Sequence, residues 1–104
     1  MLKNFKAYQY SVDFYRRCQE VRMPAFLKTQ LLRAASSVCL NLSEGSTRPV
    51  GKDRSRFYLI ALGSVRESQT VLDLNPQTEA LRRQADGLGA LVYRLCYPAA
   101  RPPG

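Results

Sequence analysis

Two runs of mostly small residues decide the fold of this chain: Arg33-Ala34-Ala35-Ser36-Ser37-Val38 and Ile60-Ala61-Leu62-Gly63-Ser64. Small side chains in the middle of a helix let a second backbone approach closely, so both runs predict buried helices that pack against each other. A cationic connection, residues 48–56, lies between them. We therefore expect a tight helix pair with positive charge at its turn.

Apolar residues recur at helical spacing and predict four helices, at about residues 5–21, 24–44, 52–74 and 77–96. In the first helix the apolar stripe is expected at Phe5, Tyr8, Val12 and Tyr15, widened by Tyr10 and Phe14, and in the fourth at Leu81, Ala85, Leu88, Val92 and Leu95. Short connections make sequential helices antiparallel, so the predicted fold is an all-α, up-down-up-down four-helix bundle over residues 1–97. The proline-rich residues 98–104 are predicted to form a disordered tail.

Three residues are expected to mark the ends of these helices. Pro24 suits the first turn of the second helix, because its missing N–H would have no partner there. Gly45 is placed to end that helix in a left-handed cap. Asn75 precedes a proline and should stop the third helix, since such a residue avoids the helical region.

Size and charge predict association with other molecules. The 104 residues make one domain with a small core, so we expect the chain to form oligomers. Sixteen Lys and Arg against eight Asp and Glu give a net charge of +8, which favours nucleic acid, an acidic protein surface or anionic lipid as partner. Simple solubility is the alternative explanation of the charge. No signal peptide or membrane-spanning run is visible, so a cytoplasmic protein that does not enter a membrane is expected.

The residue types that most catalytic sites need are missing or scattered. The sequence has no histidine, which is the usual general base and the commonest metal ligand. Cys18, Cys39 and Cys96 have no metal-site or disulfide spacing and are interpreted as reduced core thiols. The sequence therefore predicts a protein without enzymatic activity, catalytic residues, metal, cofactor or small-molecule substrate.

Several polar groups lie within the two small-residue helices. Asn41, Glu44 and Glu67 stand among apolar or small neighbours, and a buried carboxylate needs a partner. Arg33 and Arg66 are the expected partners, in ion pairs that set the register of the helices or a subunit interface. The predicted structural or interface set is Arg33, Asn41, Glu44, Gly45, Gly63, Ser64, Arg66 and Glu67.

The same helices carry a family resemblance. Asn41, Glu44 and Gly45 give the second helix an Asn-x-x-Glu-Gly ending, and the third helix has an aromatic residue, Ile-Ala-x-Gly-Ser and then Glu67. In this order the chain resembles the bacterial four-helix-bundle proteins associated with 23S rRNA intervening sequences, from Phe5 to about Leu95. Ser43 and Cys39 depart from the pattern, because the family often has Ala and Pro at these positions.

The resemblance implies an all-helical protomer that assembles into a ring, usually a pentamer, without established enzyme activity. A related branch, the accessory proteins of diversity-generating retroelements, forms similar basic rings that contact a reverse transcriptase and nucleic acid. The family name records the genomic location of some members, within inserted segments of ribosomal RNA genes.

Two functional hypotheses follow. In the first, Arg48, Lys52, Arg54 and Arg56 repeat around the ring and neutralise phosphates of RNA or DNA without sequence specificity. This requires that their charges are not matched by carboxylates of their own chain. No aromatic residue lies within that cationic loop, so base stacking is not expected there.

In the second hypothesis the chain is a structural or adaptor protein that docks an acidic protein partner. The cations near the end of the first helix and the start of the second would then matter as much as the connection. They are Arg16, Arg17, Arg22 and Lys28.

Overall fold

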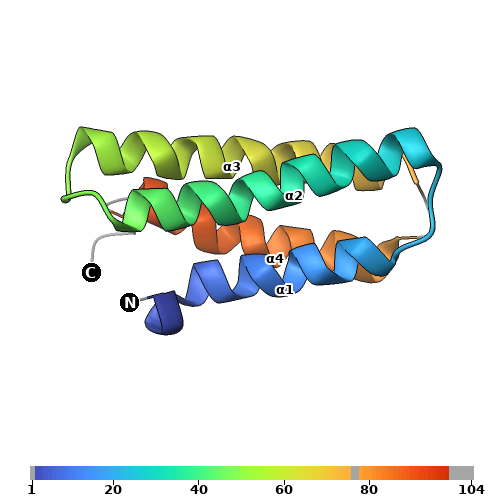
Figure 1. The fold of residues 1–104 in the computed structure, drawn as a ribbon, viewed down its shortest axis with the longest axis horizontal. Helices are drawn as coiled ribbons and strands as arrows, with labels where there is room; N and C mark the ends of the chain where they lie inside the picture. Colours follow the sequence, from blue (N-terminus) through green and yellow to red (C-terminus); the bar gives the residue numbers. More distant parts are fainter. Residues whose placement is uncertain (1, 76–77, 99–104) are drawn as a thin grey trace, which may run out of the picture.

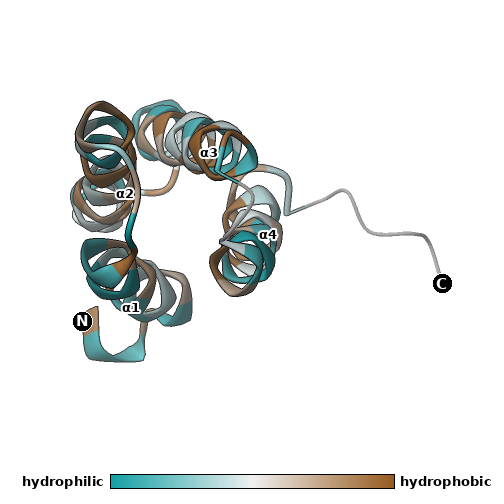
Figure 2. Cartoon of the chain, turned by 90° about the vertical axis from the view of Figure 1, so that its right-hand side faces the viewer, coloured by the Kyte–Doolittle hydropathy of each residue, from teal (hydrophilic) through white to brown (hydrophobic). Residues whose placement is uncertain are grey.

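The computed structural model describes residues 2–75 and 78–98, and all regular structure in them is helical. A short 3-10 helix η1 (Leu2–Asn4) precedes α1 (Lys6–Glu20), α2 (Ala25–Ser46), α3 (Lys52–Asp73) and α4 (Glu79–Cys96). Sequential helices run antiparallel (Figure 1) and surround a common core, as the view along the bundle shows (Figure 2). The predicted all-α four-helix bundle is confirmed.

The helices α2 and α3 pack tightly through the predicted small residues. Ala35 and Ala61 are completely buried, and Ala34 is buried beside them. The hydroxyl oxygens of Ser37 and Ser64 lie 2.8 Å apart in a hydrogen bond between the two helices. Because large side chains would hold the backbones further apart, these short side chains allow the close approach.

Two glycines of this pair behave differently from the prediction. Gly45 was expected to cap α2, but α2 continues to Ser46, and Gly45 is buried inside it. A Cβ atom on Gly45 would lie 2.7 Å from the ring of Tyr58, so the absent side chain makes room for that ring. Gly63 was expected at the contact with α2, yet it is exposed, and a Cβ there would meet nothing within 4 Å. The expected cap at Gly45 was wrong, and Gly63 does not contribute to the contact with α2 within the chain.

The chain enters α3 through Gly51, the one residue with positive φ in the described part of the chain, at φ 151°. This backbone region is open to glycine and avoided by residues with a Cβ. Asp53 then lies in the first turn of α3, where a carboxylate complements the positive end of the helix dipole. The predicted start of this helix is therefore confirmed.

The buried face of α1 is rotated from the predicted stripe. Its buried residues are Ala7, Ser11, Phe14 and Cys18, whereas Phe5, Tyr8 and Tyr15 are only partly buried and pack on the edge of the core. Small residues bring α1 close to its neighbours, and the large rings then cover the margins. Ser11 can be buried because its hydroxyl donates to the carbonyl of Tyr8 at 2.6 Å.

The predicted stripe of α4 is confirmed at Leu81, Ala85, Leu88 and Val92, which are buried, whereas Leu95 is only partly buried. Gly87 lies against α1, where a Cβ would collide with the hydroxyl of Tyr10. The missing side chain of Gly87 therefore lets the ring of Tyr10 close the bundle between α1 and α4.

The predicted helix bounds differ from the observed ones by at most two residues. The predicted start of the fourth helix and the predicted disordered tail fall largely on residues 76–77 and 99–104, outside the described residues. Within the described ranges, none of the helices combines the length and apolar character needed to cross a membrane.

Candidate functional site

The connection between α2 and α3 brings the four predicted nucleic-acid-binding cations to one end of the bundle, but most are engaged by their own chain. Arg48 forms ion pairs with Glu44, at 2.6 Å, and with Asp53, at 3.6 Å. Arg56 shares Asp53, with a closest distance of 3.1 Å between nitrogen and oxygen. Two of the four cations are therefore matched by carboxylates.

Arg54 has a different, structural engagement. Its Nε donates to the carbonyl oxygen of Gly45 at 3.1 Å, and its Nη2 donates to that of Ser46 at 3.2 Å. The last carbonyls of a helix lack partners within the helix, so Arg54 satisfies two acceptors at the end of α2. Arg54 also opposes the rise that burial causes in the pKa of Tyr58.

Lys52 is exposed, and no described residue forms an ion pair with it. The requirement that the four cations be unmatched by carboxylates thus holds for Lys52 and Arg54 but fails for Arg48 and Arg56. Four cations still face only two carboxylates, Glu44 and Asp53, which leaves the connection with a local charge of +2.

The ring of Phe57 contacts two of these cations, a feature that the sequence reasoning missed. The guanidinium carbon of Arg48 is 5.1 Å from the centroid of the ring, and that of Arg56 is 4.7 Å from it. Both distances suit cation–π contacts. The adjacency of Arg56 and Phe57 in the sequence was the available signal.

Further cations converge on the same end. Figure 1 places the start of α1, the α2–α3 connection and the end of α4 together. We call this region the basic end and define it as residues 2–8, 44–58 and 93–98. It holds seven cations and two carboxylates, a net charge of +5, whereas the other described residues hold eight cations and six carboxylates, a net charge of +2.

The sequence reasoning did not include Lys3, Lys6 and Arg94 in the candidate site. In the described part of the chain, none of these three is ion-paired. The predicted up-down topology was a sufficient signal, because it brings the first helix's start and the fourth helix's end beside the α2–α3 connection.

The predicted interface set forms different contacts from those expected. Glu44 pairs with Arg48, and Arg66 donates to the side-chain oxygen of Gln69 at 3.1 Å. Arg33 and Glu67 are exposed rather than buried as ion pairs. Within the described chain, Arg33 and Arg66 do not pair with these two glutamates, because both carboxylates face solvent; an ion pair at a subunit interface stays a prediction.

Ser64 joins α3 to α2 in the predicted region, and Asn41 supports that contact from within α2. The amide nitrogen of Asn41 donates to the carbonyl oxygen of Ser37 at 2.9 Å and to its hydroxyl at 3.1 Å. Since the Ser37 hydroxyl also bonds to that of Ser64, the three side chains form one polar chain at the contact.

Large apolar side chains remain exposed on the two central helices. We call the set Phe26, Leu40, Leu59, Ile60 and Leu74 the outer apolar face; Leu40 is 68% exposed and Ile60 is 42% exposed. Gly63 belongs to the same exposed side of α3, three residues after Ile60. Leu40, Leu59 and Ile60 thus leave large apolar side chains in water, and covering them with another molecule would be favourable.

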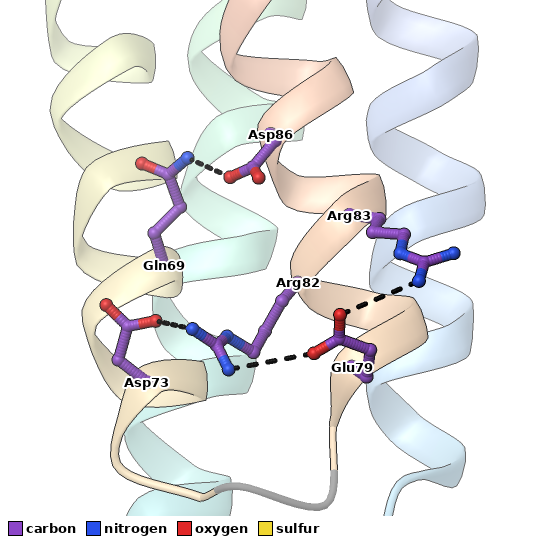
Figure 3. A pocket seen from close by; sticks show the side chains of 6 residues that line it. All are labelled: Gln69, Asp73, Glu79, Arg82, Arg83 and Asp86. Carbon is purple, nitrogen blue, oxygen red and sulfur yellow. Dashed lines mark hydrogen bonds and ion pairs between the residues drawn. The ribbon is translucent and has the colours of Figure 1, made fainter.

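A polar cleft of about 130 Å³ lies between α3 and α4 at the opposite end of the bundle (Figure 3). Arg82 pairs with Asp73 at 3.0 Å and with Glu79 at 3.8 Å, and Arg83 pairs with Glu79 at 3.7 Å. The amide of Gln69 donates to Asp86 at 2.9 Å. The lining side chains thus engage one another, and they tie α3 to α4.

The three thiols are free, and each lies in an environment that favours its protonated form. Burial raises the pKa of Cys18 to about 12 and also raises the pKa of Cys39 and of Cys96. Since the thiolate is the reactive form, these cysteines are poor nucleophiles. The described residues contain no group of three His, Cys, Asp or Glu side chains that could hold a metal ion.

Two comparisons bear on what the chain is. No curated protein matches its sequence. The model of the 23S rRNA-intervening sequence protein family matches residues 3–92, which span all four helices except the last turn of α4. The resemblance carried by the α2 and α3 sequences is thereby confirmed, and the chain belongs to the 23S rRNA-intervening sequence protein family.

Proposed function

We propose that this protein is a non-enzymatic, self-associating helical bundle of the cytoplasm that binds RNA or DNA without sequence specificity through its basic end. The observation that carries the proposal is the charge of that end, where seven cations meet two carboxylates. A polyanion gains from such a surface because each neutralised phosphate releases condensed counterions.

The ion pairs at the connection leave room for this binding. The paired side chains of Arg48, Arg56, Glu44 and Asp53 are 40 to 62% exposed. Ion pairs at such exposure contribute only about 0–1 kcal/mol, so a phosphate can replace a carboxylate at little cost. Lys3, Lys6, Lys52 and Arg94 supply cations without an ion pair in the described structure and would make the first contacts.

A salt titration tests the proposal. The purified protein is mixed with a labelled RNA or DNA of arbitrary sequence, and the dissociation constant is measured by fluorescence anisotropy at increasing salt. Binding at low salt should weaken steeply, with a similar slope for unrelated sequences. An absence of binding at low salt would refute the proposal.

Self-association is the second part of the proposal, and the outer apolar face supports it. A second copy that covers Leu40, Leu59 and Ile60 would remove their apolar surface from water. Family membership favours a ring, for which we propose five copies. Light scattering should give the mass of a pentamer for the native chain, and Leu40→Lys with Ile60→Lys should lower it; a native monomer at micromolar concentration would refute this part.

One observation favours the alternative, an adaptor that docks an acidic protein. Arg48, Arg54 and Arg56 are held in place by contacts within the chain, and such preorganised cations suit a rigid protein surface. Poly-glutamate separates the two functions. Binding to it as tight as binding to a nucleic acid of equal charge, at the same salt, would favour the adaptor.

A further inference from the structure

We propose that the nucleic acid binds as a single strand, with an unpaired base stacked on Tyr93 or Tyr97 of α4 and its phosphates beside Arg94 and Arg66. This inference rests on the proposed function and names the form of its partner. It concerns a surface groove between α3 and α4 that continues the basic end.

The two tyrosines form an exposed aromatic pair. Their ring centroids are 4.7 Å apart, with an interplanar angle of 43°, and the residues are 44% and 46% exposed. The other four tyrosines of the sequence are buried or half-buried. Tyr93 and Tyr97 therefore offer the tyrosine ring surface most accessible to a base, and aromatic rings stack on any base regardless of sequence.

A groove of about 450 Å³ adjoins this pair. Gly89 and Ala90 line it with small side chains, while Tyr93 comes from the same helix and Arg66 from α3. Gly89 leaves room for the guanidinium group of Arg66 at the groove, because a Cβ atom on Gly89 would lie only 3.2 Å from Nη1 of Arg66. Grooves of about 300–1,000 Å³ suit a small organic group such as a nucleotide.

The charge of the groove matches a phosphate backbone. Arg66 donates to the neutral side chain of Gln69, and Gln69 in turn donates to Asp86 at 2.9 Å. No carboxylate among the described residues forms an ion pair with Arg66 or Arg94. Two cations and one carboxylate line the groove, which leaves it with a charge of +1.

The groove is continuous with the basic end, because Tyr93 and Arg94 belong to both. A strand bound along α4 in this groove thus reaches the basic end at Arg94. Duplex bases are stacked on one another and cannot reach the tyrosine rings, whereas the bases of a single strand can. The combination of accessible rings and unmatched cations favours a single strand over a duplex or an acidic protein.

The test uses the full chain and four probes. Three are nucleic acids of roughly 15 nucleotides per strand: oligo-dT, oligo-rU and a DNA duplex. The fourth is inorganic polyphosphate, which has the charge but no bases. Affinities are measured for the native protein, Tyr93→Leu with Tyr97→Leu, and Tyr93→Phe with Tyr97→Phe. The phenylalanine pair retains both rings. The protein has no tryptophan, so quenching of tyrosine fluorescence reports stacking directly.

The native protein should prefer both single strands to the duplex and lose tyrosine fluorescence on binding them. The leucine pair should weaken single-strand binding by about fivefold or more, with polyphosphate binding unchanged, and the phenylalanine pair should restore it. Equal single-strand affinities for the native and leucine proteins, or a preference for the duplex, would overturn this inference while leaving the basic-end function intact. Failure to bind any of the four probes would overturn both.

Discussion

At the basic end seven cations meet two carboxylates, whereas the polar cleft at the opposite end holds two arginines and three carboxylates. The arginines of the cleft are used within the molecule, because Arg82 pairs with Asp73 of α3 and both Arg82 and Arg83 pair with Glu79 of α4 itself. The basic end keeps an excess that no internal partner cancels. The comparison shows that the balance of charge at each end, rather than the number of arginines, separates a structural tie from a binding surface.

The two ends also differ in how their backbones approach. At the basic end Gly45 of α2 lies under the ring of Tyr58 of α3, and Arg54 holds the last carbonyls of α2. At the opposite end the polar tie between α3 and α4 consists of the exposed Arg82–Asp73 ion pair and the exposed Gln69–Asp86 hydrogen bond. Substitutions at the basic end should therefore cost more stability.

The largest effect on stability is expected from Gly45→Ala. The new methyl group would stand 2.7 Å from a buried ring, and overpacking of this kind typically costs about 1–3 kcal/mol. Urea unfolding followed by circular dichroism measures the loss. An unchanged unfolding midpoint would show that the ring of Tyr58 can move aside, and would contradict a tight contact between Gly45 and that ring.

Arg54 should behave as a structural residue rather than as a phosphate ligand. Arg54→Lys keeps the charge but loses the forked hydrogen bonds to Gly45 and Ser46, so we expect a loss of about 1–2 kcal/mol in the free energy of unfolding. Nucleic-acid affinity under native conditions should change little. A stable variant with strongly reduced affinity would reverse the assignment.

Gly63→Ala is the matched control for Gly45→Ala, because a Cβ at Gly63 meets nothing within 4 Å. Replacing a glycine inside an exposed helix by alanine should stabilise the protomer by up to about 1 kcal/mol. If the outer apolar face joins copies closely at this glycine, the same change should lower the mass seen by light scattering. Destabilisation at dilutions where the protein is monomeric would contradict the open environment of Gly63.

The smallest effect is expected in the polar cleft. Arg82→Ser removes two exposed ion pairs, to Asp73 and Glu79, and should cost about 0.5–1 kcal/mol at low salt. The loss should shrink as salt is added, because screening weakens the pairs already present. A salt-independent loss would mean that Arg82 acts through packing of its aliphatic part.

Much of the fold could be predicted because its signals are local. The small residues Ala34, Ala35 and Ala61 predicted the contact between α2 and α3. The buried apolar residues of α4 recur at helical spacing, so they could also be predicted. The rotation of α1 toward Phe14 and Cys18 escaped prediction because the other buried residues, Ala7 and Ser11, are small or polar and give little hydrophobic signal. The role of Gly45 escaped because a glycine near a helix end fits a cap and a close contact equally well.

The candidate site could be predicted only in part. The sequence located the cations of the connection, but it did not show which groups they pair with, because pairing depends on distances in the fold. Arg48 lies in the connection and pairs with Asp53 of α3, whereas the side chain of Arg54 turns back to the carbonyls at the end of α2. The tyrosine pair of α4 was overlooked because it lies 37 residues or more from the connection's last cation, Arg56, and the fold alone unites the two regions.

The central claim is that the basic end, rather than overall charge, binds nucleic acid. It is tested most directly by comparing Arg48→Ser, Lys52→Ser and Arg56→Ser, made together, with Arg17→Ser, Arg82→Ser and Arg83→Ser at the opposite end. Each triple variant lowers the net charge from +8 to +5. The first should weaken binding and reduce the slope of log affinity against log salt by roughly 2, while the second should leave both nearly unchanged. Equal losses in the two variants would contradict the account.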